Sequence, residues 1–282
     1  MAHLVIVFFR SHVNGAIFHQ YPKRFLLAPL GLFTVMMLSS WILIFVFVLA
    51  VWWDVYHSSL QTFGLGRIYD KRAGNGVEAG RAIDKGLNLV FYVGPIFAGA
   101  SLLGHVKYFE RFADVGTYFF AKVPARTLSF QPFFLAAFIL AAAAYLGYYV
   151  YFYFRLVKTG YRYPLQKLFL FLSTGICSIW AWGFNPFGQA FFIMNFFHAV
   201  QYFAIVWWSE KANMRAFFKL SSLEKWKFPV LFLFLVLGTV YGAWAKFLGE
   251  SNHFAFSVLL TVSIMHFWYD GFIWSVRKNQ VA

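Results

Sequence analysis

Apolar runs of about 20 residues recur along the whole of this 282-residue chain. A helix of that length crosses the hydrocarbon core of a bilayer, which is about 30 Å thick. Hydrophobic residues make up 61% of the chain and charged residues only 12%, about half the charged share of a soluble domain. The sequence therefore predicts an all-α, polytopic integral membrane bundle of about seven to eight transmembrane helices.

Seven segments are the strongest candidates to cross the membrane: 41–64, 86–104, 130–155, 166–184, 188–209, 228–247 and 254–276. Residues 24–40 are apolar too, and Ser39-Ser40 favours a tight turn that makes them a separate short helix. Residues 1–22 are expected to form an interfacial or half-buried N-terminal helix, and 65–85 a cytoplasmic Gly-rich loop. All of these parts are expected to belong to a single transmembrane domain, residues 1–282.

The net charge of +14 comes from basic residues that lie between the apolar runs. Cytoplasmic loops of membrane proteins carry such residues, so nucleic acid is not expected as a partner. The basic connections 156–165 and 210–227 and the tail with Lys278 predict a cytoplasmic C-terminus, in a multi-pass protein of the bacterial inner membrane. The single cysteine, Cys177, excludes a disulfide within the chain and a Cys-based zinc site.

Two acidic residues are expected inside the spans, and each has a histidine about one helical turn away. Asp54 precedes His57 by three positions, and Asp270 follows His266 by four. These spacings put both side chains on one helix face. Ionisable groups at membrane depth are costly, rare and usually functional. The two pairs therefore indicate a functional centre, in which Asp54 and Asp270 are the candidate catalytic residues.

His198 lies on a third span and has neutral neighbours, Asn195 and Gln201. With the predicted orientation, His57, His198 and His266 each lie about 15–20 Å along a helix from its basic flank. Three histidines on three spans thus share one layer of the membrane. A common metal centre explains that coincidence, whereas histidines that only bond to neighbouring helices do not require it.

Neutral imidazole is a good ligand for zinc, iron and copper, and two histidines with one carboxylate are typical of non-haem iron oxygenases. The sequence therefore predicts a transition metal, with iron preferred. The candidate metal ligands are His12, His57, His198, His266 and Asp270. His3 is an alternative to His12 as the residue that completes a four-histidine set. Direct and supporting roles remain open for Asp54, Gln61, Asn195, Gln201 and Asp270.

Aromatic residues flank the clusters, with Tyr56 beside His57 and Trp268 inside the His266 motif. An apolar, aromatic-walled cavity beside a metal suits a lipid, polyene or quinone. The candidate cofactor-binding residues are Tyr56, Asn195, Gln201 and Trp268.

The segment His266-Phe267-Trp268-Tyr269-Asp270 resembles the His-x-x-x-Asp motif of the polytopic bacterial membrane carotene dioxygenases related to Brp and Blh. Asp54 and His57 occur in the reverse order, His198 lacks an acid, and the family's Pro-His-Gly opening has no counterpart. The resemblance covers these motif positions only. It implies an all-helical membrane fold, histidine-held iron and cleavage of β-carotene to retinal.

These observations predict a membrane-embedded, metal-dependent oxygenase or oxidoreductase that acts on a hydrophobic, lipid- or polyene-like substrate. Two alternatives remain open. His198 and His266 could instead hold haem or another pigment in a non-catalytic or structural subunit of a membrane complex, with other membrane subunits as partners. Asp54 and Asp270 could alternatively relay protons in a coupled transporter.

Overall fold

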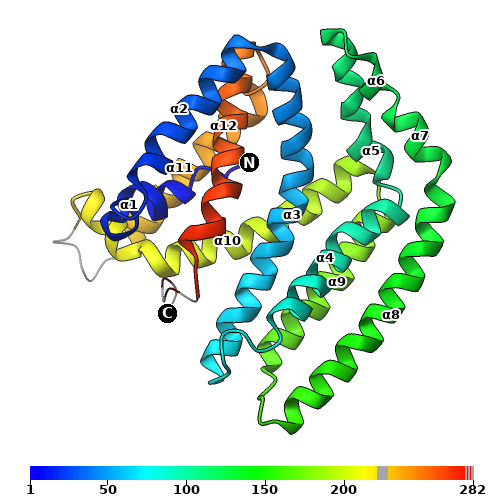
Figure 1. Cartoon of the computed structure of the whole chain (residues 1–282). Helices are drawn as coiled ribbons and strands as arrows, with labels where there is room; N and C mark the ends of the chain where they lie inside the picture. The colour runs from blue at the N-terminus through cyan, green and yellow to red at the C-terminus, as the bar shows by residue number, and fades with distance from the viewer. Residues whose placement is uncertain (221–227, 277, 279, 281–282) are drawn as a thin grey trace. The chain divides into compact units, whose positions relative to one another are not determined.

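The computed structural model describes residues 1–220, 228–276, 278 and 280. These residues contain helices and turns and no strand, which confirms the all-α prediction. The chain forms a π-helix η1 (Phe9–Val13), a 3₁₀ helix η2 (Lys107–Val115) and the α-helices of Figure 1. The α-helices are α1 (Gly15–Phe18), α2 (Pro22–Leu38), α3 (Ser40–Arg72), α4 (Arg81–Ala98), α5 (Leu102–Val106), α6 (Tyr118–Ala121), α7 (Val123–Ser129), α8 (Gln131–Lys158), α9 (Leu165–Phe184), α10 (Phe187–Phe217), α11 (Phe228–Phe247) and α12 (His253–Ile273).

Within the described residues, six helices are long and apolar enough to cross a membrane: α3, α8, α9, α10, α11 and α12. The number rises to seven if α4 and the bent segment after it count as one span. The chain thus has the helix lengths and composition of a multi-pass membrane protein. The turn expected at Ser39-Ser40 is confirmed, because α2 ends at Leu38, Ser39 is extended and α3 begins at Ser40.

Several predicted boundaries differ from the structure. The predicted span 86–104 is not one helix, because α4 ends at Ala98 and the chain bends by 96° before α5. The predicted loop 65–85 is wrong in extent: α3 continues through Arg72, and α4 begins at Arg81. Buried ion pairs around Arg67 hold this end of α3 in helical form.

The chain divides into two compact units, and the single domain 1–282 stays a prediction. Unit 1 comprises Met1–Ala50 and Phe197–Trp274, and unit 2 comprises Val51–Phe196 and Ser275–Ala282. In unit 1, α12 is the most buried of the six candidate spans and packs along α2. A helix that is apolar on all sides is expected in such a position. The side chain of Asn252 caps its first turn by accepting a hydrogen bond from the Ala255 amide.

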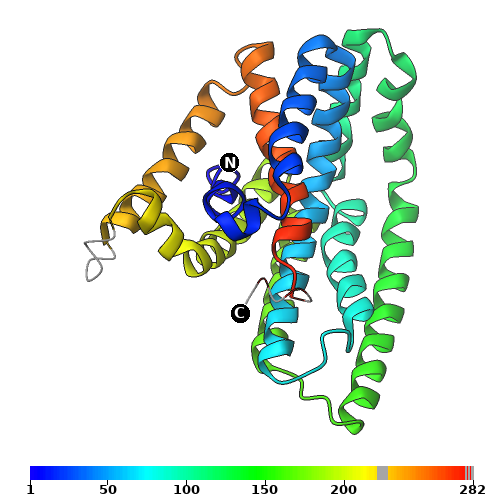
Figure 2. The same cartoon turned by 60° about the vertical axis from the view of Figure 1, so that its left-hand side comes forward.

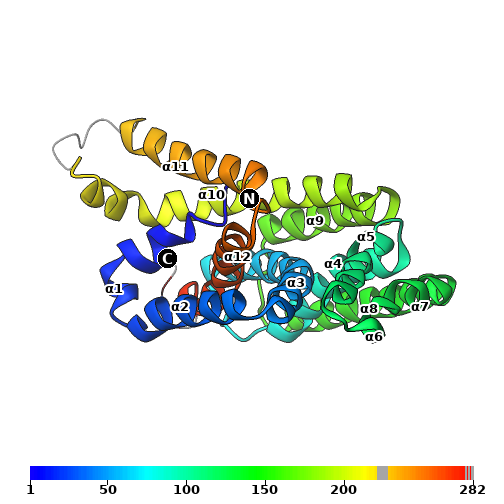
Figure 3. The ribbon, with the colours of Figure 1, turned by 90° about the horizontal axis from the view of Figure 1, so that it is seen from above.

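Residues 1–14, called the N-terminal segment below, are buried in unit 1 more deeply than the sequence predicted. His3, Leu4, Ile6 and Phe9 are all almost inaccessible to solvent. The segment lies between α11 and α12, as the views in Figures 2 and 3 show. It therefore brings residues from the start of the chain into the core of unit 1.

In unit 2, α4 packs against both α8 and α9. The helices approach closely at glycines: a Cβ at Gly94 would lie 1.8 Å from the ring of Phe138, and one at Gly86 would collide with Tyr145. Large aromatic side chains, including Tyr92 and Trp182, fill the core between these helices.

Candidate metal centre

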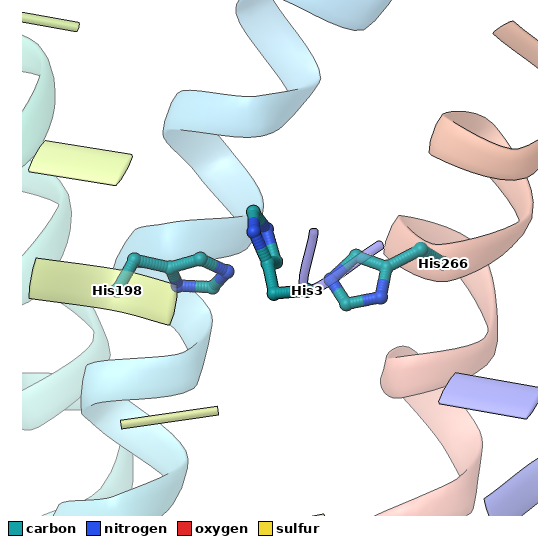
Figure 4. A group of neighbouring side chains, drawn as sticks. All are labelled: His3, His198 and His266. Atoms are coloured by element: carbon teal, nitrogen blue, oxygen red, sulfur yellow. The ribbon is translucent and has the colours of Figure 1, made fainter. Parts of the chain in front are cut away.

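Three histidines from distant parts of the sequence meet in the core of unit 1. His3 comes from the N-terminal segment, His198 from α10 and His266 from α12, and none is more than 1% exposed. One ring nitrogen of each lies within 4.8 Å of the corresponding nitrogens of the other two. Figure 4 shows the ring of His3 between those of His198 and His266. Two of these residues were predicted ligands, and His3 was the predicted alternative to His12.

The three rings meet edge to face rather than stacking. Their centroids are 4.9 Å apart for His3 and His198, 5.2 Å for His3 and His266, and 6.3 Å for His198 and His266, with interplanar angles of 78–89°. Imidazole nitrogens bind a metal at about 2.0–2.1 Å, so tetrahedral ligands lie about 3.4 Å apart. A small inward movement of the side chains would therefore let all three nitrogens bind one ion.

The N-terminal segment is fixed by a buried arginine, which in turn positions His3. Nη1 of Arg10 lies 2.5 Å from Oε1 of Glu210 on α10, and Nη2 donates to the carbonyl oxygen of Ile273 over 3.1 Å. Asn14 donates to the same carboxylate. The guanidinium also lies 4.5 Å from the ring centroid of Trp274. Arg10 thus joins the segment to both helices that supply the other histidines.

Two glycines on α11, Gly238 and Gly242, lie against the N-terminal segment at Ala2. A Cβ at Gly242 would lie 3.0 Å from Cβ and 3.2 Å from Cα of Ala2, and a Cβ at Gly238 would lie 3.3 Å from the Ala2 carbonyl oxygen. The spacing of four residues puts both glycines on one face of the helix. The backbone next to His3 can approach α11 because Gly238 and Gly242 have no side chain at this point of contact.

Tyr202 connects the histidines to Asp270. Its ring lies nearly parallel to that of His198, one turn earlier on α10, and its centroid is 4.6 Å from that of His266. Its hydroxyl donates to Oδ1 of Asp270 over 2.8 Å, and Trp274 Nε1 donates to the same oxygen over 2.9 Å. The sequence reasoning missed Tyr202, although its i,i+4 spacing from His198 was a usable signal.

The other predicted centre residues on α3 belong to unit 2. Oδ2 of Asp54 accepts a hydrogen bond from Nδ2 of Asn195 over 3.2 Å, so these two predicted clusters meet. His57 is buried, whereas Tyr56 is 39% exposed, and its ring centroid lies 5.7 Å from Nζ of Lys85. The convergence of His57 with the histidines of unit 1 stays a prediction.

His12 lies outside the group of three histidines. Its Nδ1 is 2.7 Å from Oγ of Ser11, and its Nε2 is 3.4 Å from the carbonyl oxygen of Phe25. Burial lowers the pKa of His12, and the hydrogen bond to Phe25 opposes this shift only in part. Trp268 packs against Tyr269 and Phe272 on its own helix, and the half-buried Gln201 follows His198 on α10. Metal or cofactor binding by these residues stays a prediction.

Unit 2 contains a buried ionic cluster that the sequence reasoning missed. Nζ of Lys167 lies 2.6 Å from Oδ2 of Asp84 and 3.0 Å from Oδ2 of Asp70. Nη1 of Arg67 lies 2.7 Å and 2.9 Å from the same oxygens of Asp70 and Asp84. The two positive and two negative charges balance. Asp70, Asp84 and Glu210 are fully buried, whereas Asp54 is 7% exposed and Asp270 is half-buried. That Asp54 and Asp270 are the acids inside the membrane spans stays a prediction.

Tyrosine hydroxyls satisfy the remaining carboxylate oxygens of the ionic cluster. Tyr149 and Tyr153 donate to Oδ1 of Asp84, and Tyr161 donates to Oδ1 of Asp70. Arg67 also donates to loop carbonyls, including that of Ala79. The cluster joins α3, α4, α8 and α9, and its carboxylate oxygens are all occupied by hydrogen bonds or ion pairs. The signals in the sequence were the i,i+3 pair Arg67–Asp70 and the row of tyrosines on α8.

No family model matches the chain, and no curated protein or solved structure matches it either. The resemblance to membrane carotene dioxygenases therefore stays a prediction.

Proposed function

We propose that this chain is a membrane-embedded metalloprotein in which His3, His198 and His266 bind one transition metal ion. The observation that carries the proposal is the approach of three buried imidazole nitrogens to within 4.8 Å of one another. Neutral imidazole is a ligand for iron, zinc and copper. Three protein ligands leave at least one coordination position open, as in catalytic rather than structural metal sites.

We propose iron as the metal and oxidation of a hydrophobic molecule as the reaction. His3, His198 and His266 would hold the iron, and with its open positions it would supply the activation of dioxygen when bound. The residues around it exclude water and fix the histidines: Tyr202 packs against two of the rings, and Asp270 holds the Tyr202 hydroxyl. The lipid bilayer is the expected partner of the protein. Lipids or polyenes are the substrates that can enter a centre among apolar helices from the bilayer.

Haem is the less favoured cofactor. His198 and His266 would have to leave room for a haem between their rings, but the ring of His3 lies between them (Figure 4). A visible spectrum of the purified protein distinguishes the two cofactors. A Soret band would favour haem, and its absence from an iron-containing protein supports direct binding by the three histidines.

The metal proposal is tested by element analysis of protein purified from iron-supplemented cells. Wild type is expected to contain stoichiometric iron, and His266→Gln and His198→Gln are expected to lose most of it. His19→Gln is the matched control, because His19 lies on an exposed turn of the same unit. Each variant is checked for a monodisperse elution profile. A wild-type protein free of transition metals contradicts the proposal.

The reaction is tested separately on the iron-loaded protein. Oxygen consumption is measured in detergent micelles with and without β-carotene, the substrate that the family resemblance implies. Uptake that depends on β-carotene and is lost in His266→Gln supports an oxygenase. An iron-loaded protein that consumes no oxygen with β-carotene leaves the metal site intact and removes this substrate.

We further propose that the protein lies in a bacterial inner membrane with its C-terminus in the cytoplasm. The support is the basic character of the connection after α8 and of the tail, with Lys158, Arg162 and Lys278 as examples. C-terminal fusions test the orientation. A fusion to green fluorescent protein is expected to fluoresce, and a fusion to alkaline phosphatase is expected to be inactive. The reverse pair of results contradicts a cytoplasmic C-terminus.

A further inference from the structure

At the bend between α4 and α5 in unit 2, backbone groups form hydrogen bonds with α8 and α9. The amide of Ala100 donates to the carbonyl oxygen of Gly183 over 2.9 Å, and that of Ser101 donates to Trp182 over 3.2 Å. Gln131 Nε2 donates to the carbonyl oxygen of Gly99 over 3.0 Å. A Cβ at Gly99 would lie 2.4 Å from Cα of Gly183, so only glycine allows this contact. The end of α9 therefore supports a break in a membrane-length segment.

Three side-chain atoms at this bend have no hydrogen-bond partner among the described residues. They are Oγ of Ser101, Nε2 of His105 and Nε1 of Trp182. The three residues are 0–2% exposed, so bulk water does not reach them. Buried polar groups nearly always have a partner, because leaving one unsatisfied is costly. The three residues contact one another, so three such atoms at one place point to a bound group.

The donor and acceptor roles of these atoms define what that group is. Nδ1 of His105 lies 3.0 Å from the carbonyl oxygen of Ser101, which only accepts, so Nδ1 carries the hydrogen. Nε2 of the neutral ring is then an acceptor. The indole of Trp182 only donates, and its ring centroid is 4.8 Å from that of His105. These two rings, which are in contact, thus offer one acceptor and one donor.

We propose that the bend binds an O–H group, which donates to Nε2 of His105 and accepts from Nε1 of Trp182. The hydroxyl of Ser101 completes the site, because it can donate or accept. Trp52 and Phe187 pack on the His105 ring, with ring centroids 5.3 Å and 4.7 Å from that of His105. Such walls suit the hydroxyl of an apolar alcohol, and an internal water presents the same chemistry. The site shares no residue with the metal centre and does not depend on it.

Thermal unfolding in detergent tests the proposal with dodecan-1-ol as the probe and dodecane as the matched alkane. An alcohol bound at the bend raises the Tm of wild type more than dodecane does. Trp182→Phe keeps a ring and removes the donor, so the alcohol concentration for half of the effect should rise about fivefold. Trp180→Phe is the control, because Trp180 is 53% exposed on the same helix. Ser101→Ala replaces Trp182→Phe if that variant does not fold.

A high-resolution experimental structure of the protein purified without alcohol gives the second arm. Equal responses to dodecan-1-ol and dodecane, with a density peak within hydrogen-bond distance of both His105 Nε2 and Trp182 Nε1, assign the O–H group to an internal water. A preference for the alcohol that Trp182→Phe or Ser101→Ala weakens assigns it to an apolar alcohol. Equal responses to both probes and no density between the two atoms overturn the proposal.

Discussion

Tyr202 donates its hydroxyl hydrogen to Oδ1 of Asp270 over 2.8 Å, while its ring packs 4.6 Å from that of His266. His266 and Asp270 share a helix face, and Tyr202 on α10 reaches both. Tyr202 thus connects Asp270 to the three histidines, by a hydrogen bond on one side and by ring contacts on the other. The carboxylate can orient the side chains around a metal whether or not it binds the metal itself.

Replacing Tyr202 with phenylalanine removes the bond to Asp270 and keeps the ring. Partners of ligating residues typically contribute about 10–100-fold to metal affinity. Because Tyr202 acts on the histidines by packing, we expect a loss at the lower end of that range. Competition with a coloured chelator measures it. Tyr148→Phe is the control, since Tyr148 is exposed on α8. An unchanged metal affinity in Tyr202→Phe would show that the Tyr202 hydroxyl does not support the metal site.

Gly242→Val is expected to weaken metal binding without altering any ligand. The new side chain would collide with Ala2 and displace the backbone that carries His3. We expect a loss of bound iron comparable to that of His3→Gln, measured by element analysis. Gly147→Val serves as the control, because a Cβ at Gly147 meets no atom within 4 Å. Wild-type iron content in Gly242→Val would show that His3 does not depend on this contact.

Lys167→Met should destabilise unit 2 strongly, because Asp70 and Asp84 would then share a single cation, Arg67. Removing one partner of a buried ion pair typically costs about 3–5 kcal/mol. Thermal unfolding in detergent measures the loss, with the exposed Lys158→Met as the control. The double variant Lys167→Met, Asp84→Asn restores charge balance and is expected to recover part of the stability. A double variant less stable than Lys167→Met would contradict this account.

Unit 2 should lose stability at alkaline pH through Tyr163, in the connection between α8 and α9. Burial raises the pKa of Tyr163 to about 12; the hydrogen bond with Tyr149 opposes this shift, and Asp84 and Asp70 add to it. The unfolded phenol titrates near pH 10. Between these values the unfolded state has lost its proton and the folded state has kept it, so stability falls as pH rises.

Thermal unfolding between pH 8 and pH 12 measures this loss. Tyr163→Phe is expected to flatten the decline above about pH 10. The difference in absorbance at 295 nm between wild type and the variant reports the titration of Tyr163 itself. A phenol that titrates at its ordinary pH in the folded protein would contradict the prediction.

The sequence predicted the helices well where apolar length alone decides them. The segment 228–247 coincides with α11, and the break at Ser39-Ser40 is present. The extension of α3 beyond residue 64 could not be found in this way, because Arg67 and Asp70 look like loop residues in a hydropathy pattern. Their charges are compensated by Lys167 and Asp84, which lie far away in the sequence.

The centre was predictable only where spacing within one helix reveals it. His198 and His266 were found because each has polar neighbours one turn away. His3 has no such neighbour, and its place depends on Arg10 reaching Glu210 across 200 residues of sequence. The same limit applies to His105, whose position at a bend depends on the end of α9. Contacts between distant segments leave no periodic trace in a single sequence.

The separation of His3 from His266 also fixes when this centre can form. His266 is synthesised 263 residues after His3. Until α12 is synthesised and inserted, the proposed three-histidine site lacks His266, so an ion that needs all three ligands can bind only after that step. Ribosome-bound chains arrested before α12 would accordingly retain no metal, however long they are incubated with it.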